Sequence, residues 1–174
     1  SSVSSTIIVI NNVDDSTFTY SDNIYCQTNS SSVTPTLAVS GGSFTSSPLG
    51  LNINATTGII LPSVSTVGTY TIEFTSNGIC STTSSLSLEI NAPDDATFSY
   101  PINFYCQSNS EIVTPTLNYI GGTFSVSPTG LDLNVSTGGF SPTSSDLGIY
   151  TIEHTTSGVC SATSTFTLRI RPND

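Results

Sequence analysis

The four cysteines are the residues whose type and spacing point most directly to chemistry. Cys26 and Cys80 are separated by the same interval as Cys106 and Cys160. Structural zinc sites use closely spaced pairs of ligands, and these cysteines have no second cysteine nearby in sequence, so a metal site is disfavoured. An even count in a repeated register favours one disulfide within each half of the chain, in an oxidising, extracellular compartment. The predicted pairs are Cys26 with Cys80 and Cys106 with Cys160, each worth about 4 kcal/mol in the chain-entropy description.

Two pairs of adjacent aspartates are the candidate metal ligands. Asp14-Asp15 and Asp94-Asp95 occupy equivalent positions in the two halves of the chain. Calcium takes six to eight oxygen ligands, so Asn91, Glu89 and loop carbonyls would have to complete a site near Asp94 and Asp95. The simpler interpretation is that these aspartates cap turns in solvent. It is the favoured one, and no cofactor is predicted.

The single histidine, His154, is the only candidate general base, and the pattern around it argues against catalysis. It stands where the first half has Phe74, on the inward-facing side of a predicted strand. No Gly-x-Ser-x-Gly elbow accompanies it, so a buried structural histidine is preferred over a Ser-His-Asp triad. Gly41-Gly42 and Gly121-Gly122 precede strands and have no lysine or helix after them, which indicates turn or bulge glycines and not a phosphate-binding loop.

Covalent crosslinks of the kind found in surface proteins are also disfavoured. Isopeptide bonds need lysine, and the chain has none. A thioester from Cys26-Gln27 or Cys106-Gln107 would need neighbouring side chains to meet, although adjacent residues of a strand point to opposite faces. We therefore predict no catalytic residues and no enzyme activity.

These residues occur in pairs because the chain repeats itself. Residues 11–90 align with residues 91–170 without a gap, at a period of 80 residues, and Tyr25-Cys26-Gln27 falls on Tyr105-Cys106-Gln107. Roughly half of the aligned pairs are identical, which indicates one folding unit used twice. Two copies of a catalytic domain would be unusual, whereas tandem copies of a spacer or binding module are common. We predict one domain over 11–90 and a second over 91–174.

The first ten residues extend the repeat in the other direction. Ser4–Ile10 lies one period before Ser84–Ile90, which lies one period before Ser164–Ile170. Residues 1–10 are therefore predicted to be the terminal strand of an upstream repeat. Two alternatives remain: a donor strand that completes the sheet of a neighbouring subunit, as in pili, or an opening strand of the first domain.

Composition excludes several classes of partner. The chain carries 2 basic and 12 acidic residues, for a net charge of −10. Such a chain repels phosphate backbones and anionic headgroups, so neither nucleic acid nor a membrane surface is an expected partner. The longest apolar run, Ile7–Ile10, is too short to insert in a membrane. With the cysteines, this composition predicts an extracellular, cell-surface location.

The local pattern predicts β-structure throughout. Ser, Thr and β-branched residues dominate, and Gly, Pro or Asn interrupts the chain about every ten residues, the spacing of a β-sandwich. In residues 69–75, Tyr70, Ile72 and Phe74 alternate with polar residues, so the three should face a core. Asn77-Gly78 predicts a tight hairpin turn, followed by a return strand that begins at Cys80. Shorter strands are expected over the ranges 18–20, 24–26, 36–39, 43–44, 51–54 and 59–61.

A more specific signature fixes the type of sandwich. Asp146-Leu147-Gly148-Ile149-Tyr150 matches the D-x-G-x-Y run of a tyrosine corner, and Tyr70 occupies the same place in the first half. The cysteine that antibody domains place two residues after this tyrosine is replaced by Ile152. We therefore predict an all-β chain of two tandem immunoglobulin-like antiparallel β-sandwich domains.

The order of the motifs resembles a known group of proteins. The stretches 50–60 and 68–72, and the series 94–100, 105–107, 121–125 and 158–160, resemble the Ig-like and cadherin-like tandem repeats of giant surface adhesins. These adhesins belong to gliding bacteria and are exported by the type IX secretion system. The resemblance implies cell-surface filaments, adhesion and gliding motility, and it brings no catalytic residues with it.

The leading functional prediction is thus a non-enzymatic stalk or spacer segment of a surface filament or adhesin. Its expected partners are neighbouring repeats of the same polypeptide or filament, and surface glycans are candidates. The alternatives are a pilus-like subunit that donates residues 1–10, and a carbohydrate-binding module of a secreted protein. The absence of Trp and the core positions of most Tyr residues weaken the last.

Overall fold

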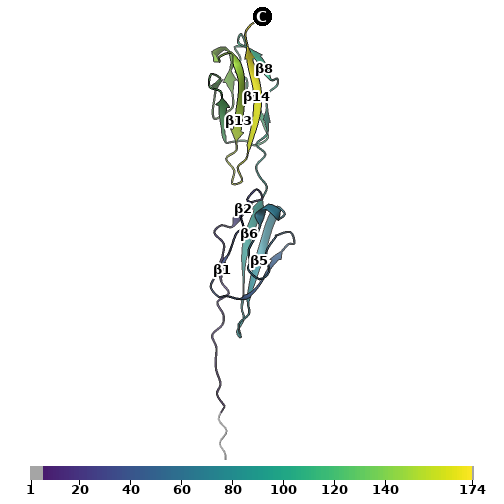
Figure 1. The fold of residues 1–174 in the computed structure, drawn as a ribbon, viewed down its shortest axis with the longest axis vertical. Coiled ribbons are helices and arrows are strands. Elements are labelled where there is room, and N and C mark those ends of the chain that lie inside the picture. Colours follow the sequence, from purple (N-terminus) through teal and green to yellow (C-terminus); the bar gives the residue numbers. More distant parts are fainter. Residues whose placement is uncertain (1–5, 174) are drawn as a thin grey trace, which may run out of the picture. The chain divides into compact units, whose positions relative to one another are not determined.

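The computed structural model describes residues 6–173 and divides into two compact units, with the division between Ala92 and Pro93. Here the part before the division is called unit 1 and the part after it unit 2. Each unit consists of strands in two layers (Figure 1). Apart from two short 3-10 turns, Pro62–Val64 and Pro142–Ser144, residues 6–173 contain no helix. Accordingly, none of the described residues forms a helix that could cross a membrane.

Unit 1 is built on one long hairpin. Strands β5 (Gly68–Ser76) and β6 (Thr83–Asn91) pair antiparallel from Gly68 opposite Ile90 to Thr75 opposite Thr83. The edges of this four-stranded sheet are β4 (Gly42–Ser47), antiparallel to β5, and β2 (Ile24–Cys26), parallel to β6. The strand order is β2-β6-β5-β4. The parallel pairing of β2 places Cys26 beside Asn91, at the end of β6.

The second layer of unit 1 consists of short pairings. Strands β1 (Phe18–Thr19) and β3 (Thr36–Leu37) are antiparallel, and single bridges join Val33 to Ile60 and Ile60 to Ile53. These segments match the short strands and the hairpin expected from the sequence, although β3 stops two residues earlier than predicted. The arrangement is an immunoglobulin-like β-sandwich, which confirms the predicted fold class.

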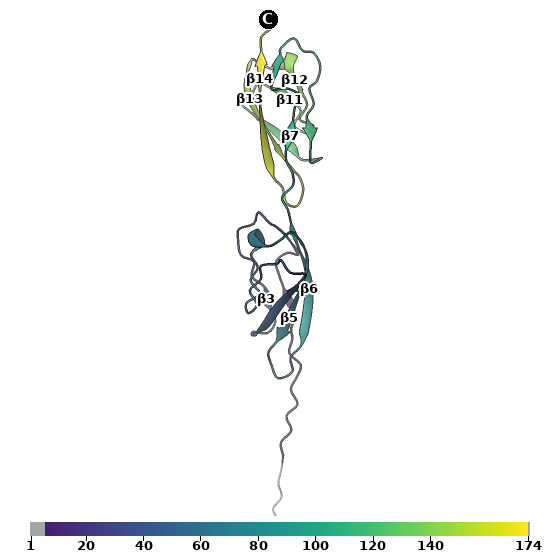
Figure 2. The ribbon, with the colours of Figure 1, turned by 90° about the vertical axis from the view of Figure 1, so that its right-hand side faces the viewer.

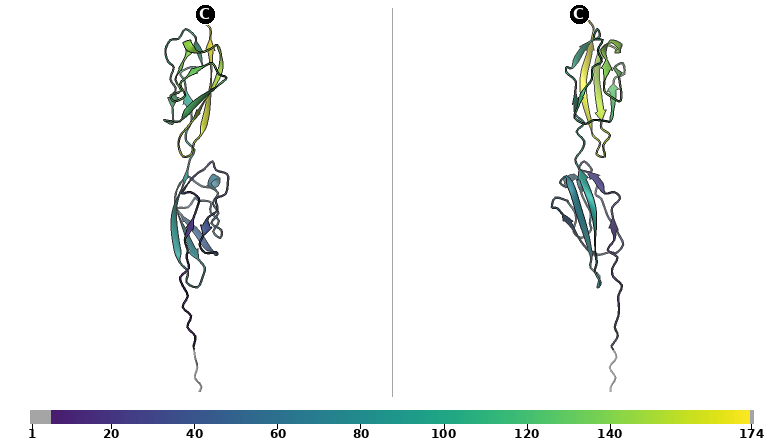
Figure 3. Two further views of the ribbon diagram at one scale, coloured as in Figure 1. Left: turned by 90° about the vertical axis from the view of Figure 1, so that its left-hand side faces the viewer. Right: turned by 180° about the vertical axis from the view of Figure 1, so that it is seen from behind.

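Unit 2 repeats this architecture and adds a pair of short strands, β11 (Asp132–Leu133) and β12 (Phe140–Ser141), where unit 1 has only the bridge between Ile53 and Ile60. Its large sheet consists of β10 (Thr123–Ser127), β13 (Gly148–Thr155), β14 (Thr163–Arg171) and β8 (Phe104–Cys106), in the order β10-β13-β14-β8, and β8 is parallel to β14. Figure 2 shows β11 and β12 on the side of the unit opposite β13 and β14, and Figure 3 gives two further views of the layers. The two remaining short strands, β7 (Phe98–Ser99) and β9 (Thr116–Leu117), pair antiparallel.

The core of each unit lies between its layers and follows the alternation seen in the sequence. In β5, Tyr70, Ile72 and Phe74 are at most 2% exposed, as predicted. Phe18 of the opposite layer meets Phe44 edge-on, with ring centroids 5.5 Å apart. Such contacts stabilise a core beyond the burial of area alone. Unit 2 has its own separate cluster built from the equivalent residues.

The tyrosine corner predicted from the D-x-G-x-Y run is present in both units. The Tyr150 hydroxyl donates to the carbonyl oxygen of Asp146 at 2.9 Å, and the Tyr70 hydroxyl donates to that of Thr66 at 2.6 Å. Both rings are buried. Each bond anchors the start of the central strand to the segment before it, and burial raises the pKa of Tyr150. The spacing of the D-x-G-x-Y run therefore predicted this hydrogen bond correctly.

Two local expectations were wrong. The return strand begins at Thr83 and not at Cys80, because residues 77–82 form a longer loop closed by Ser76 N–H donating to the Thr82 carbonyl oxygen at 3.0 Å. The Asn77-Gly78 turn is absent because the Asp14 carboxylate captures the Gly78 N–H at 3.0 Å. A side chain distant in sequence thus overrides the local turn preference.

The predicted strand over residues 1–10 is not seen in the part of the chain that the structure describes. Residues 1–5 lie outside the described residues, and residues 6–10 belong to no strand. Ile8 and Ile10, which are equivalent to the buried Leu88 and Ile90 of β6, are 83% and 92% exposed. Residues 6–10 therefore do not pair as part of an opening strand of unit 1.

Candidate functional site

His154, the only candidate base, is fully buried in the core of unit 2. Its ring stacks on Phe124, with centroids 4.5 Å apart and planes inclined by 16°. Nδ1 lies 3.1 Å from the carbonyl oxygen of Ala96, and Nε2 lies 2.9 Å from that of Gly121. Both nitrogens thus face backbone carbonyls, and no water-accessible side remains for a substrate. His154 is placed as the sequence indicated, as a core residue of β13.

The first aspartate of each pair closes a loop. Asp14 accepts from the Gly78 N–H and, at 2.7 Å, from the Ser76 hydroxyl, and Asp94 accepts from the Gly158 N–H at 3.0 Å. An added Cβ at Gly78 or Gly158 would overlap these carboxylates, so a larger residue there would force the aspartate to move. Asp14 and Asp94 hold the loop between the two long strands against the segment that enters each unit.

The second aspartate of each pair caps a turn at the surface. The Thr17 hydroxyl and then the Thr17 N–H, both donating to Asp15, lower the pKa of that carboxyl. Thr97 and Asn118 lower the pKa of Asp95 in the same way. A lowered folded-state pKa stabilises the fold above the ordinary pKa of aspartate, and this contribution is lost as the pH falls through the lowered value.

Calcium is therefore expected to have no effect on stability, because the oxygens that it would need already accept protein hydrogen bonds. Within residues 6–173 no three His, Cys, Asp or Glu side chains form a group that could hold a metal ion. We predict the same melting temperature, by differential scanning calorimetry, in excess calcium and in chelator. The Asp94→Asn variant, which keeps the shape of the side chain, serves as the control. A calcium-dependent increase that this variant abolishes would instead establish a site at the Asp94-Asp95 pair.

The cysteines do not pair within units as predicted. Cys26 and Cys160 are disulfide-bonded, and Cys80 and Cys106 are free thiols. The strand register gives the reason. Cys26 lies beside Asn91 at the end of β6, whereas Cys80 precedes the start of that strand. Eight residue steps at about 3.3 Å separate the two ends by about 26 Å, and a disulfide needs Cα atoms about 4.4–6.8 Å apart. The predicted pairing within each unit is wrong.

The glutamines that follow Cys26 and Cys106 have structural roles. Gln27 Nε2 donates to the carbonyl oxygen of Ser65 at 2.9 Å, and Gln107 Nε2 donates to that of Ser145 at 2.8 Å. Both amides thus bind the segment after the 3-10 turn of their unit.

The outer face of the large sheet of unit 2 carries a feature that the sequence analysis missed. Phe104, Arg169 and Ile149 are cross-strand partners in a row over β8, β14 and β13. The guanidinium of Arg171 lies 4.6 Å from the centroid of the Phe104 ring, a distance at which cation–π attraction operates. Phe104 and Ile149 are 43% and 58% exposed. We call Phe104, Leu147, Ile149, Arg169 and Arg171 the arginine face.

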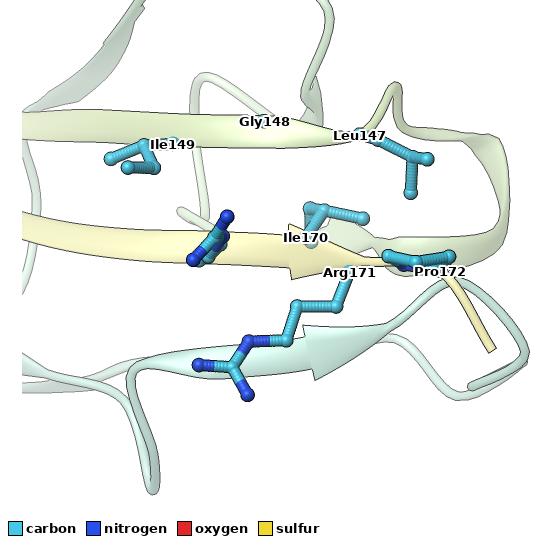
Figure 4. Close-up of a pocket in the computed structure, with 7 residues that line it drawn as sticks. Leu147, Gly148, Ile149, Ile170, Arg171 and Pro172 are labelled. Atoms are coloured by element: carbon cyan, nitrogen blue, oxygen red, sulfur yellow. The ribbon is translucent and has the colours of Figure 1, made fainter. Parts of the chain in front are cut away.

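The arginine face holds both basic side chains of a chain whose net charge is −10. It borders a shallow hollow of about 400 Å³ lined by Leu147, Gly148, Ile149, Arg169, Ile170, Arg171 and Pro172. Figure 4 shows the Arg171 side chain extended along the neighbouring strand. Unit 1 has Glu89 and Asn91 at the two arginine positions. The sequence did hold a signal for this face: at two exposed strand positions, the second repeat has arginine where the first has Glu89 and Asn91.

Comparisons with known proteins identify no family. No family model matches the chain, and no curated protein matches it. Similar solved structures include three extracellular fragments. Mouse cadherin-23 EC22-24 has 15% identity and a TM-score of 0.38, over 92% of this chain and 68% of that one. Human CDH23 EC21-23 has 11% identity and a TM-score of 0.37, over 89% and 69%. Human protocadherin-24 EC1-2 has 9% identity and a TM-score of 0.37, over 87% and 94%.

Proposed function

We propose that this chain is a non-enzymatic structural segment of a repeat protein that acts outside the cell, as a stalk or spacer in a surface filament or adhesin. The observation that supports the proposal most strongly is the kind of feature that the two units share. Both keep the aromatic core, the tyrosine corner and the aspartate that closes the long hairpin. All of these features stabilise a fold, and none offers a reactive group to solvent.

The differences between the units lie where a spacer tolerates change. Phe74 is replaced by His154 in the core with its stacking partner retained, and Glu89 is replaced by Arg169 on the outer face. An enzyme with two active copies would be expected to repeat its reactive side chains, yet the only histidine has no counterpart in unit 1. The disulfide-bonded cysteines support an oxidising compartment.

A mechanical experiment tests the spacer role. Pulled from its ends under reducing conditions, the chain is expected to unfold in two separate force peaks, one per unit. Each should release roughly 250 Å of chain, since about 80 residues extend to 3.3–3.6 Å each. A module whose task is not mechanical has no need of such resistance, so extension without distinct peaks would speak against a stalk.

The kind of filament to which the chain belongs is proposed from the order of its sequence motifs. The resemblance to adhesin repeats of gliding bacteria supports a filament exported by the type IX secretion system, with neighbouring repeats as the main partners. The exposure of Ile8 and Ile10 supports a strand whose sheet lies elsewhere, either in an upstream repeat or, as in pili, in a second subunit. Size-exclusion chromatography with and without residues 1–10 separates these: concentration-dependent oligomers that vanish on removal would favour the pilus-like subunit.

A second candidate function is adhesion to acidic surface glycans through the arginine face. Arg169 and Arg171 present guanidinium groups, which pair well with carboxylates and sulfates, beside an exposed aromatic ring. The two guanidinium groups are complementary to an acidic polysaccharide, and because the chain as a whole is acidic, such a ligand would be confined to the arginine face.

Binding to immobilised alginate, compared with neutral dextran, tests this function. We expect the Arg169→Ser/Arg171→Ser variant to lose about tenfold in affinity, the scale of one charge-assisted contact. The control is Thr19→Asp/Ser87→Asp, which changes the net charge by the same amount at exposed positions of unit 1. Equal loss in both variants, or none in either, would remove the arginine face as a binding site.

A further inference from the structure

One hairpin of unit 2 has an outer side that carries only small and polar residues. Strands β11 and β12 pair Asp132 with Ser141, and the Asn134 N–H donates to the Gly139 carbonyl oxygen at 2.7 Å. Directly opposed residues, and residues two apart on one strand, point to the same side of a hairpin. These four residues therefore share one side, and Leu133, whose side chain packs against the core, lies on the other.

The same hairpin of unit 1 carries two large apolar side chains on its outer side. The Asn54 N–H donates to the Ile59 carbonyl oxygen at 2.9 Å, so the register is the same as in unit 2. By the repeat, Ile59 is equivalent to Gly139 and Leu61 is equivalent to Ser141. The branched side chains of this side in unit 1 are thus replaced in unit 2 by a hydrogen atom and a hydroxymethyl group.

These replacements leave a hollow on the surface of unit 2. Its volume is about 430 Å³, and its lining includes Asp132, Asn134, Thr137 and Gly139. Sites for small ligands have volumes of about 300–1,000 Å³. A Cβ built on Gly139 would lie 3.4 Å from Cγ2 of Ile112. This isoleucine is 62% exposed and forms an apolar wall beside the glycine. We call the space between these five residues the hairpin hollow.

The polar groups around the hairpin hollow can make further hydrogen bonds. Asn134 Oδ1 accepts from the Ser136 and Thr137 N–H groups at 3.0 and 3.1 Å, which leaves the two Nδ2 protons available. Thr137 Oγ1 accepts from the Gly139 N–H at 3.2 Å and keeps its own proton for a ligand. Within residues 6–173, no protein group donates to the Asp132 carboxylate. The hollow therefore offers one charged acceptor and two donors.

We infer that the hairpin hollow binds a neutral sugar, as one ring of a glycan. A sugar hydroxyl both donates and accepts, so adjacent hydroxyls can donate to the Asp132 carboxylate while they accept from Asn134 and Thr137. Hydrogen bonds to a carboxylate are roughly twice as strong as those between neutral groups. The C–H groups of the ring pack against Ile112, the apolar wall of the hollow.

The charge of the hairpin hollow favours a neutral ligand. Asp132 is the charged residue of its lining, and a uronic acid or a sulfated sugar would bring a second negative charge beside it. Calcium takes six to eight oxygen ligands, for which one carboxylate is a poor start. Both arginines lie on the large sheet, and Figure 2 shows β11 and β12 on the opposite side of the unit. The hairpin hollow and the arginine face are therefore separate sites for different classes of glycan.

A sugar site in unit 2 goes beyond the spacer role, because a spacer needs no ligand. It also gives a physical reason for the loss of Ile59 and Leu61 from the second repeat. The two units would then share their fold, while unit 2 alone presents the hairpin hollow.

Titration of the isotope-labelled full chain with neutral methyl glycosides, followed by the NMR shifts of its amide groups, tests the inference. The probes are methyl α-D-mannoside, methyl β-D-galactoside and methyl β-D-glucoside. We expect at least one of them to shift the amides of residues 132–141 and of Ile112, with a Kd of about 1 mM, the affinity usual for ligands of this size. No shift of these amides by any of the three in large excess would overturn the inference. Equal shifts of them by glucuronate would overturn the choice of a neutral ligand.

Two variants that take their residue from unit 1 locate the site. Gly139→Ile fills the hollow and should weaken binding at least about tenfold. Gly139 is outside the left-handed region, and the nearest atom to its added Cβ is the side-chain oxygen of Thr137 at 3.3 Å. The variant should therefore fold, which its melting temperature checks. Asp132→Asn keeps the shape of the side chain, removes its charge and should weaken binding about tenfold, the scale of one charge-assisted contact.

The matched control is Glu153→Gln, which removes the same charge at an exposed position of β13 in the same unit. It should bind as the parent does, and so should Arg169→Ser/Arg171→Ser, which removes the arginine face. Equal affinity in Asp132→Asn and Glu153→Gln would show that the carboxylate does not contact the sugar. Unchanged binding by a folded Gly139→Ile chain would place the ligand elsewhere, and either result would overturn the inference.

Discussion

Replacing Gly122 with alanine is expected to destabilise unit 2 by at least about 3 kcal/mol, the range reached only when backbone strain and overlap combine. Gly122 has φ +98°, and a Cβ there would lie 2.1 Å from the Thr155 carbonyl oxygen and 2.9 Å from the Thr156 Cα. These are backbone atoms of β13 and of the residue after it, opposite the first pair of the β10–β13 ladder. They cannot move aside without breaking that pairing.

The measurement is urea unfolding of the reduced chain, followed by tyrosine fluorescence, with unit 1 as an internal reference. The control is Gly148→Ala, since the nearest atoms to its added Cβ are those of the Tyr150 ring at 3.5 Å, an ordinary contact. We expect the control to stay within about 1 kcal/mol of the parent. A Gly122→Ala chain as stable as the Gly148→Ala chain would show that β10 does not approach β13 as described.

Replacing His154 with alanine is expected to cost unit 2 about 3 kcal/mol, as for other large buried rings. The substitution removes the stack on Phe124 and the edge contact with Phe98. It also leaves the carbonyl oxygens of Ala96 and Gly121 without their imidazole contacts, and unpaired buried acceptors are costly.

Unit 1 suggests the matched variant, because Phe74 fills the equivalent position and packs on Phe44, with ring centroids 4.7 Å apart. His154→Phe keeps a ring against Phe124 and loses only the polar contacts. We therefore expect its loss in free energy of unfolding to be less than half of the loss caused by His154→Ala. Thermal unfolding of both variants gives the comparison. If alanine proved harmless, the histidine would not be a core residue and its chemistry would need a new explanation.

The sequence predicted those features that depend on periodicity or on the repeat. Tyr70, Ile72 and Phe74 alternate with polar residues, which was enough to identify the central strand and its buried face. The tyrosine corner was predictable because its spacing is local. His154 could be placed in the core because the repeat aligned it with Phe74.

The features that the sequence did not predict depend on contacts between distant residues. The hairpin turn at Asn77-Gly78 was lost to Asp14, which lies near the beginning of the unit. The disulfide pattern depends on β2 being parallel to β6, which puts Cys26 and Cys80 at opposite ends of a strand. Equal spacing of cysteines shows that a unit is repeated, but it does not say whether the two cysteines of one unit lie close enough to bond. The arginine face likewise appears only once the register brings Phe104, Arg169 and Ile149 into one row.

The most direct test of a tension-bearing repeat chain measures its extension under force. Pulled from its ends after reduction, the chain should lengthen in two force peaks, one for each unit, and each peak should release roughly 250 Å of chain. Extension without distinct force peaks would contradict the structural role.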